Sequence, residues 1–372
     1  MAEPLKNAYG PDIPRRIGAM IAAVHPAFDT RAFVRDCLAG YGELELIARG
    51  GKIADALHRH LPPDFPEAVE ILVRSFGPTL PSTEGGNGLA PFLYMPHAQF
   101  VARYGLEHFE PSMRAQLEIT RRFTAEFSIR PFLERHREAT LRRLAEWTSD
   151  PDPHVRRLVS EGTRPRLPWA SRLREFQRDP APVLALLERL KDDPELYVRR
   201  SVANNLNDIG KDHPEVLFAT ARRWLEDADE NRRWIVRHAL RSAVKRGEAG
   251  ALAALGYGKP ATLAVRSTSV TPARVRKGGA VTVAFEVVND GRRAARAIVD
   301  FRVWFVKASG AAAPKVFKLR SVELAPGEAA RLSKKVSLAD LTTRRHYPGD
   351  HAVEAIVNGK PAPIGRFRLV GG

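Results

Sequence analysis

The chain has 372 residues, of which 44% are hydrophobic and 27% are charged. This composition is typical of a folded globular protein, and the length is enough for two or three domains. No apolar run reaches the length of a membrane-spanning helix, and the N-terminal segment lacks the apolar core of a secretory signal, so we expect a cytoplasmic protein. The single cysteine, Cys37, excludes an intrachain disulfide and a cysteine-based zinc cluster.

The net charge of +16 predicts a polyanionic partner. Residues 260–372 contain 20 Lys and Arg against 8 Asp and Glu, so this segment alone carries an excess of +12. The alternative is a soluble domain that is basic without functional consequence. Because the excess is concentrated in one part of the chain, we favour the polyanion.

From residue 11 to about residue 256 the apolar residues recur at helical spacing, as in Ile17, Met20, Ile21 and Val24. Turns rich in Pro, Gly and Asp separate these stretches and mark the ends and starts of helices. The segment 76–90 (FGPTLPSTEGGNGLA) is predicted to be a long loop, either a connector or a loop that contacts a ligand.

A short motif recurs in the second half of this helical region. Residues 155–159 (VRRLV) return as 198–202 (VRRSV), 43 residues later, and more weakly as 236–240 (VRHAL). Helix pairs with a period near ~40 residues are typical of HEAT-like repeats, which stack into a solenoid with a concave face for an extended ligand. We therefore expect an all-α HEAT-like repeat solenoid over residues 1–258.

Beyond this region the hydrophobic period changes to two. Residues 281–288, 297–306 and 353–357 alternate apolar and polar side chains, and turns such as NDGRR and APGEA separate them. About seven short strands in this length predict an all-β immunoglobulin-like sandwich over residues 259–372.

Six blocks of sequence, residues 1–14, 95–110, 120–132, 160–169, 201–209 and 233–241, carry a specific resemblance. In this order they resemble the AlkC family of alkyl-DNA glycosylases, related to AlkD, whose members commonly carry a C-terminal immunoglobulin-like domain. The resemblance implies a DNA-repair glycosylase that hydrolyses the N-glycosidic bond of N3-methyladenine and N3-methylcytosine in double-stranded DNA. It implies no cofactor and no metal, and we expect a monomer that does not bind membranes.

The reaction of such an enzyme needs few catalytic side chains. Alkylation places a positive charge on the base, so the base departs neutral and needs no general acid. The sugar becomes oxocarbenium-like, and a carboxylate near C1′ can stabilise that charge and orient a water molecule. Enzymes that act on bases normally extrude them into a pocket. The resemblance implies instead that the base is not flipped and that bent DNA lies in the groove.

Glu161 is the first candidate for a catalytic carboxylate. It lies at the apparent end of a helix, where Gly162 is expected to permit a left-handed turn. A carboxylate at a helix C-terminus is electrostatically unfavourable, and a broken local rule of this kind indicates function. The alternative is a solvated glutamate paired with Arg164 or Arg166.

Asp208 and Glu126 are the second and third candidates. Asp208 occupies the equivalent place one repeat later, so both acids can face one concave surface; alternatively, Asp208 bonds to its own helix end. Glu126 is predicted to lie in an apolar helix over residues 123–130. Its alternative role there is a helix salt bridge with Arg122 or Arg130.

DNA contacts are expected from aromatic and basic side chains. Trp169 can stack on a base or a deoxyribose, or else pack in the core. Arginine forks suit phosphate oxygens. The remaining candidates are Arg157, Arg164, Arg166, Arg200, Arg237, His238 and Arg241, with a structural role as the alternative for His238. Trp147, Trp224 and Trp234 are expected in the core.

The competing function is a non-catalytic HEAT-repeat scaffold that binds nucleic acid. A nuclease is less favoured, because no sequence cluster of Asp, Glu and His suits a divalent metal. No Walker or dinucleotide-binding glycine motif is present either.

Overall fold

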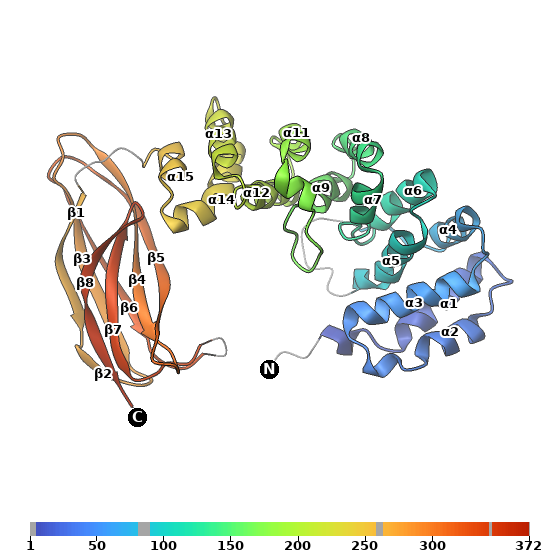
Figure 1. Ribbon diagram of the computed structural model, residues 1–372, viewed down its shortest axis with the longest axis horizontal. Coiled ribbons are helices and arrows are strands. Elements are labelled where there is room, and N and C mark those ends of the chain that lie inside the picture. The colour runs from blue at the N-terminus through green and yellow to red at the C-terminus, as the bar shows by residue number, and fades with distance from the viewer. Residues whose placement is uncertain (1–4, 81–89, 258–262, 342–343, 372) are drawn as a thin grey trace. The chain divides into compact units, whose positions relative to one another are not determined.

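The computed structural model describes residues 5–80, 90–257, 263–341 and 344–371. Residues 81–89 of the predicted loop, and the predicted domain boundary between residues 258 and 259, lie outside the described residues. Within these ranges helices occupy the chain up to Ala254 and strands occupy it from Leu263 onward (Figure 1). The predicted order, a helical region followed by a β-sandwich, is confirmed.

The described part of the chain forms fifteen α-helices: α1 (Asp12–Val24), α2 (Thr30–Leu38), α3 (Leu46–His60), α4 (Phe65–Arg74), α5 (Met95–Tyr104), α6 (Phe109–Thr120), α7 (Ile129–Arg135), α8 (Arg137–Trp147), α9 (Pro153–Gly162), α10 (Arg174–Arg178), α11 (Ala181–Leu190), α12 (Leu196–Ile209), α13 (Pro214–Leu225), α14 (Glu230–Arg246) and α15 (Ala249–Ala254). Three 3-10 helices accompany them: η1 (Leu5–Ala8), η2 (Tyr41–Glu43) and η3 (Ala90–Tyr94).

The chain divides into two compact units. Unit 1 comprises residues 1–213 and 227–239, and unit 2 comprises residues 214–226 and 240–372. Helix α13, the C-terminal part of α14 from Leu240 and helix α15 therefore belong to the same unit as the strands. Within unit 2, Gly247 and Gly359 meet backbone to backbone, both with positive φ; a Cβ added to Gly247 would lie 2.6 Å from the Cα of Gly359.

The recurring motif has a structural explanation at its first arginine. Nη1 of Arg156 in α9 donates to the carbonyls of Asp150 and Pro151, in the turn before its own helix. Nη1 of Arg199 in α12 donates to the carbonyls of Asp193 and Pro194, which form the equivalent turn. The leading valines Val155, Val198 and Val236 are all fully buried. The repeat therefore preserves a turn and a core contact.

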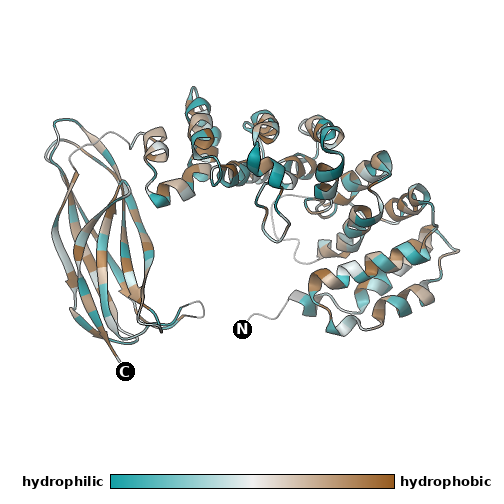
Figure 2. Ribbon diagram, in the orientation of Figure 1, coloured by the Kyte–Doolittle hydropathy of each residue, from teal (hydrophilic) through white to brown (hydrophobic). Residues whose placement is uncertain are grey.

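Unit 2 contains two β-sheets with the strands β1 (Leu263–Thr271), β2 (Arg274–Arg276), β3 (Ala280–Asn289), β4 (Ala295–Val306), β5 (Ala312–Leu324), β6 (Ala329–Ser337), β7 (Gly349–Val357) and β8 (Lys360–Val370). The order is β1-β3-β6 in one sheet and β2-β8-β7-β4-β5 in the other; only the β2–β8 pair is parallel among the described strands. Hydrophobic and hydrophilic residues alternate along the strands (Figure 2). The inward residues, such as Phe285, Phe301 and Phe367, form one core between the sheets.

Candidate active site

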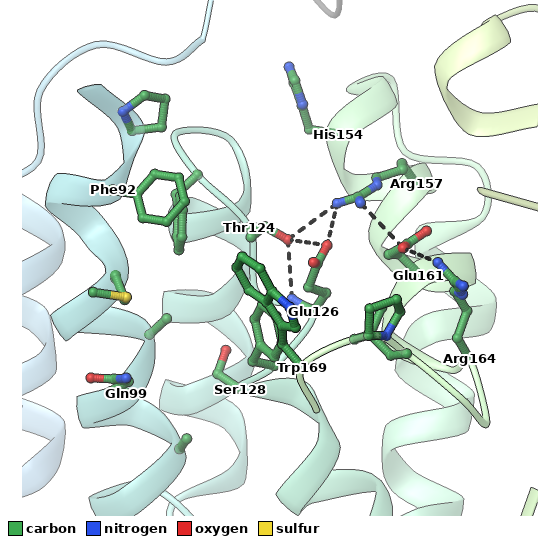
Figure 3. Close-up of a pocket in the computed structure, with 18 of the residues that line it drawn as sticks. Phe92, Gln99, Thr124, Glu126, Ser128, His154, Arg157, Glu161, Arg164 and Trp169 are labelled. Atoms are coloured by element: carbon green, nitrogen blue, oxygen red, sulfur yellow. Dashed lines mark hydrogen bonds and ion pairs between the residues drawn. The ribbon is translucent and has the colours of Figure 1, made fainter. Parts of the chain in front are cut away.

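A pocket of about 680 Å³ lies in unit 1. Its walls come from η3 and α5, from the segment between α6 and α7, from α9 and the loop after it, and from the start of α12. The aromatic residues of the lining are Phe92, Phe123, Phe127, Trp169 and Tyr197. The charged residues of the lining are Glu126, Arg157, Glu161 and Arg164. Figure 3 shows these four charged side chains gathered on one side of the pocket.

Arg157 joins two of the predicted catalytic acids. Its Nη1 lies 2.5 Å from Oε2 of Glu126, and its Nη2 lies 3.5 Å from Oε1 of Glu161 (Figure 3). Its guanidinium also stacks on the ring of Tyr197, 5.2 Å from the ring centroid. Thr124 donates to Oε2 of Glu126 over 3.0 Å. Arg157 is therefore bound on three sides within the wall of the pocket.

A second arginine joins Glu161 to the third predicted acid. Nη1 of Arg164 donates to Oε1 of Glu161 over 2.6 Å, and Nε donates to Oδ2 of Asp208 over 2.8 Å. Asp208 is only 2% exposed and also binds Lys211, so it lies behind Arg164 and outside the lining of the pocket. The hydroxyl of Ser201 completes the shell of Glu161 by donating to Oε2 over 2.5 Å.

These contacts set the protonation states. Burial on its own would raise the pKa of Glu161, but the positive charges of Arg157 and Arg164 and the hydrogen bond from Ser201 outweigh burial, so this pKa lies below its ordinary value. Burial would lower the pKa of Arg157, yet Glu126 and Glu161 raise it above its ordinary value. Both groups are therefore charged at neutral pH.

The segment that carries Glu126 differs from the prediction. Helix α6 ends at Thr120 and helix α7 begins at Ile129, so Glu126 lies in the connection between them and not in a helix. The predicted alternative, a helix salt bridge, is wrong. Arg122 binds Glu118, and Arg130 binds backbone carbonyls. The irregular backbone of this connection instead directs Glu126 toward Arg157 on helix α9.

Gly162 also differs from the expectation. It is the last residue of α9 and does not have a positive φ. A Cβ at this position would lie 2.6 Å from Cγ2 of Ile129, so glycine is required for the close approach of α9 to the start of α7. This approach brings Glu161 of α9 near the segment that carries Glu126. Glu161 does pair with Arg164, but it is only 6% exposed and therefore is not the solvated glutamate of the alternative interpretation.

Trp169 is not a core residue. Its side chain is 78% exposed, it lines the pocket, and its backbone adopts φ 66°. A residue with a side chain rarely adopts this left-handed conformation, because the Cβ then crowds the carbonyl group. Trp147 and Trp224 are buried as expected. Trp234 is only half-buried and stacks on His238, with ring centroids 4.9 Å apart.

The predicted DNA-contact residues fall into two groups. Arg157, Arg164 and Arg166 are engaged by carboxylates; Nε of Arg166 donates to Oδ2 of Asp212 over 2.9 Å. The geometry therefore does not favour the expectation that these three arginines bind phosphates, because carboxylates already engage their guanidinium groups. Arg200 and Arg237 are exposed, and Arg241 is half-buried. His238 shares a hydrogen bond of 3.2 Å with Asn204, in line with its structural alternative.

Three residues that line or support the site have no signal in the sequence pattern. Thr124 and Ser201 bind the two acids directly, and Tyr197 stacks on Arg157. A hydroxyl group does not alter the hydrophobic pattern. Thr124 and Ser201 lie in the blocks of family resemblance, 120–132 and 201–209, but resemblance over a block does not identify the role of one residue in it. No three His, Cys, Asp or Glu side chains of the described residues gather closely enough to hold a metal ion. None of the described helices is both long and apolar enough to span a membrane.

Two parts of the chain match known protein families. Residues 123–243 match the family described as DNA alkylation repair enzyme, and residues 264–371 match the C-terminal Ig-like domain of uncharacterised protein YhaZ. The protein YhaZ of Bacillus subtilis (strain 168) is 35% identical over 357 residues, which cover 96% of each chain.

A solved structure gives the same result. Alkylpurine DNA glycosylase AlkC from Pseudomonas fluorescens, bound to DNA containing an abasic site analog, is 37% identical, with a TM-score of 0.87 over 99% of this chain and 100% of that one. Identity at this level over nearly the full length of both chains, together with a shared order of helical and β regions, establishes the relationship. The chain belongs to the AlkC family of DNA alkylation repair enzymes.

Proposed function

We propose that this protein is a monofunctional DNA glycosylase that hydrolyses the N-glycosidic bond of cationic alkylated bases, N3-methyladenine and N3-methylcytosine, in duplex DNA. The observation that carries the proposal is that Glu126 and Glu161, from separate segments, line one pocket and share Arg157. The resemblance to the DNA-bound AlkC structure supports the choice of reaction.

The charge of the site suits this reaction. A cationic base leaves as a neutral molecule, so the enzyme needs to stabilise the positive charge that develops on the deoxyribose. Preorganised carboxylates in a pocket that partly excludes water stabilise such a charge at low reorganisation cost. Burial would raise the pKa of Glu161, but Arg157 and Arg164 outweigh burial and lower this pKa, so Glu161 is ionised at neutral pH.

The two acids have different duties in our proposal. Both oxygens of Glu161 are engaged, Oε1 by Arg157 and Arg164 and Oε2 by Ser201. Among the described residues nothing binds Oε1 of Glu126, because its contacts all use Oε2. We therefore assign the water-orienting role to Glu126 and charge stabilisation to Glu161. Asp208 acts as a positioning residue, because it holds Arg164 against Glu161.

The aromatic side of the pocket suits the lesion. Trp169 and Phe127 are 78% and 38% exposed, so both present ring surface to a ligand. An aromatic face attracts a cationic ring and stacks on a deoxyribose or base. We propose that the base is recognised here without being flipped, the bend of the DNA bringing the sugar to the acids.

Contacts to the DNA backbone are assigned to the exposed basic residues. These are Arg200 on α12 and Arg237 on α14. Arg241, further along α14, is half-buried, and His238 keeps the structural role given by its hydrogen bond with Asn204. Phosphate contacts from such residues fix the register of the protein on DNA. The paired arginines Arg157, Arg164 and Arg166 are assigned instead to holding carboxylates.

The test is release of free methylated base from dimethyl-sulfate-treated DNA, with wild type, Glu126→Gln and Glu161→Gln. Release by wild type and a loss of at least about 10²-fold in each variant, with DNA affinity retained, is expected. Glu134→Gln in α7 is the matched control, because Glu134 is exposed and lies outside the pocket lining. No release by wild type would favour the non-catalytic DNA-binding scaffold.

Base flipping is tested separately. A 2-aminopurine base at the lesion position or beside it fluoresces strongly when it is unstacked. We expect bound DNA to show no large increase at the lesion position. A large increase that Trp169→Ala abolishes would contradict the non-flipping part of the proposal and leave the hydrolysis untouched.

A further inference from the structure

Arg130 is a buried arginine whose hydrogen bonds within the described part of the chain all go to backbone carbonyls. It is 2% exposed and lies at the start of α7. Nη1 donates to the carbonyl of Gly162 over 3.0 Å and to that of Arg164 over 2.9 Å. Nη2 donates to the carbonyl of Ser171 over 2.5 Å. The three acceptors span the end of α9 and the loop that follows it.

The carbonyl groups that Arg130 binds help to compensate its buried charge, alongside the more distant charges of Glu134 and Glu126. The last carbonyl groups of a helix lack partners within the helix and carry partial negative charge, so a cation is favourable there. Gly162 is the last residue of α9, and no carboxylate among the described residues binds Arg130. Burial lowers the pKa of Arg130 to about 10, which still leaves it charged at neutral pH.

Arg130 links the two ends of the loop that contains Trp169. By binding the carbonyls of Arg164 and Ser171, a single guanidinium brings together the two ends of the segment that contains Trp169. Within this segment, Arg166 forms a second link by binding Asp212, three residues after the end of α12. Trp169 itself is 78% exposed and held at φ 66°. A strained, exposed aromatic residue needs its surroundings to determine its conformation.

We propose that Arg130 is a positioning residue that closes the segment 164–171 and thereby fixes Trp169 at the mouth of the pocket. The proposal rests on the proposed function for the consequence on base release, but the closure itself is independent of it. Lysine cannot replace this arginine, because one ammonium group cannot donate along the fixed directions of the fork to carbonyls at both ends of the loop.

The first test is limited trypsin digestion of wild type, Arg130→Lys and Arg49→Lys. The segment and its flank contain bonds that trypsin can cut, Arg166–Leu167 and Arg172–Leu173. Cleavage of native protein requires local opening, so loss of the closure raises its rate. Arg49 is the matched control, because it is also a buried arginine that donates to backbone carbonyls, those of Lys6, Tyr9, Gly42 and Leu44.

We expect Arg130→Lys to raise cleavage at these two bonds about tenfold, and Arg49→Lys to leave it within about twofold. Equal cleavage in wild type and Arg130→Lys would overturn the closure. So would an increase of the same size in Arg49→Lys, because a global loss of stability would then explain it. Thermal melting of both variants separates local from global opening.

The second test is a double-mutant cycle on the rate constant for base release in a single turnover. Arg130→Lys is expected to lower this constant about tenfold in wild type, with affinity for undamaged DNA within about twofold. In Trp169→Ala, the same substitution is expected to change the constant by less than about twofold, because its effect passes through Trp169. A tenfold fall in both backgrounds would overturn the assignment to Trp169.

The two tests separate this proposal from the proposed function. Absence of base release by wild type would overturn the glycosylase assignment and any role of Trp169 in excision. The trypsin digestion would then still decide whether Arg130 closes the loop. Rapid release by wild type, with unchanged cleavage in Arg130→Lys, would leave the glycosylase intact and overturn the closure alone.

Discussion

The hydroxyl group of Ser201 in α12 donates a hydrogen bond to Oε2 of Glu161 in α9, over 2.5 Å and across 40 residues of sequence. Ser201 is buried, and its bond is one of the contacts that hold the pKa of Glu161 below its ordinary value, after Arg157 and Arg164 have offset the effect of burial. This hydroxyl therefore helps to keep the acid ionised.

Ser201→Ala is expected to shift the acid limb of the pH–rate profile to higher pH. Removal of a donor to the ionised form raises the pKa of Glu161, so the active carboxylate is lost at a higher pH as the solution is acidified. The measurement is kcat/KM for base release against pH. Ser112→Ala is the control, because Ser112 is equally buried but donates to the carbonyl of Gly105. An acid limb that stays in place would argue against ionised Glu161 in catalysis.

Arg157→Gln is expected to lower the free energy of unfolding by about 3 kcal/mol at pH 7, since it leaves Glu126 and Glu161 without their shared counter-ion. The loss is expected to be smaller near pH 4, because protonation of Glu161 removes the charge that Arg157 balances. Urea unfolding at the two pH values measures both. Arg200→Gln, at the same position of the recurring motif but exposed, is expected to change stability by less than about 0.5 kcal/mol. Equal effects of the two variants would refute the special role of Arg157.

Trp169→Gly is expected to be about 1 kcal/mol more stable than Trp169→Ala, because glycine adopts the left-handed conformation at φ 66° without strain. Both variants are expected to release methylated base more slowly than wild type, because both lack the exposed ring. Thermal melting and single-turnover release measure the two effects. An alanine variant as stable as the glycine variant would show that the backbone relaxes away from this conformation.

Arg200→Gln is expected to flatten the salt dependence of DNA binding. Each phosphate contact contributes about 0.9 to the slope of log K against log salt, so loss of one contact lowers the slope by about that amount. Arg166→Gln is the control. Because Arg166 is already paired with Asp212, this substitution is expected to leave the slope unchanged. Titrations at several salt concentrations decide between them, and an unchanged slope in Arg200→Gln would remove it from the phosphate contacts.

The recurring motif illustrates the limit of sequence patterns at the site. Arg157 and Arg200 occupy the same position in two copies, yet Arg157 lies between two acids and Arg200 is exposed. The difference arises because Glu126, 31 residues away in an irregular connection, meets Arg157. No local pattern encodes a neighbour from another element. The same holds for Arg130, whose carbonyl acceptors lie 32 to 41 residues further along the chain.

The hydrophobic period of the sequence by itself determined that helices give way to a β-sandwich, because amphipathic helices and half-buried strands bury apolar side chains at fixed intervals. Its blocks of resemblance determined the family. Only the tertiary structure decided that Glu126 leaves the helical path, that Asp208 lies behind Arg164, and that Ser201 and Arg130 support the site. Those features depend on hydrogen bonds and ion pairs between distant segments, whose geometry exists only once the helices have packed.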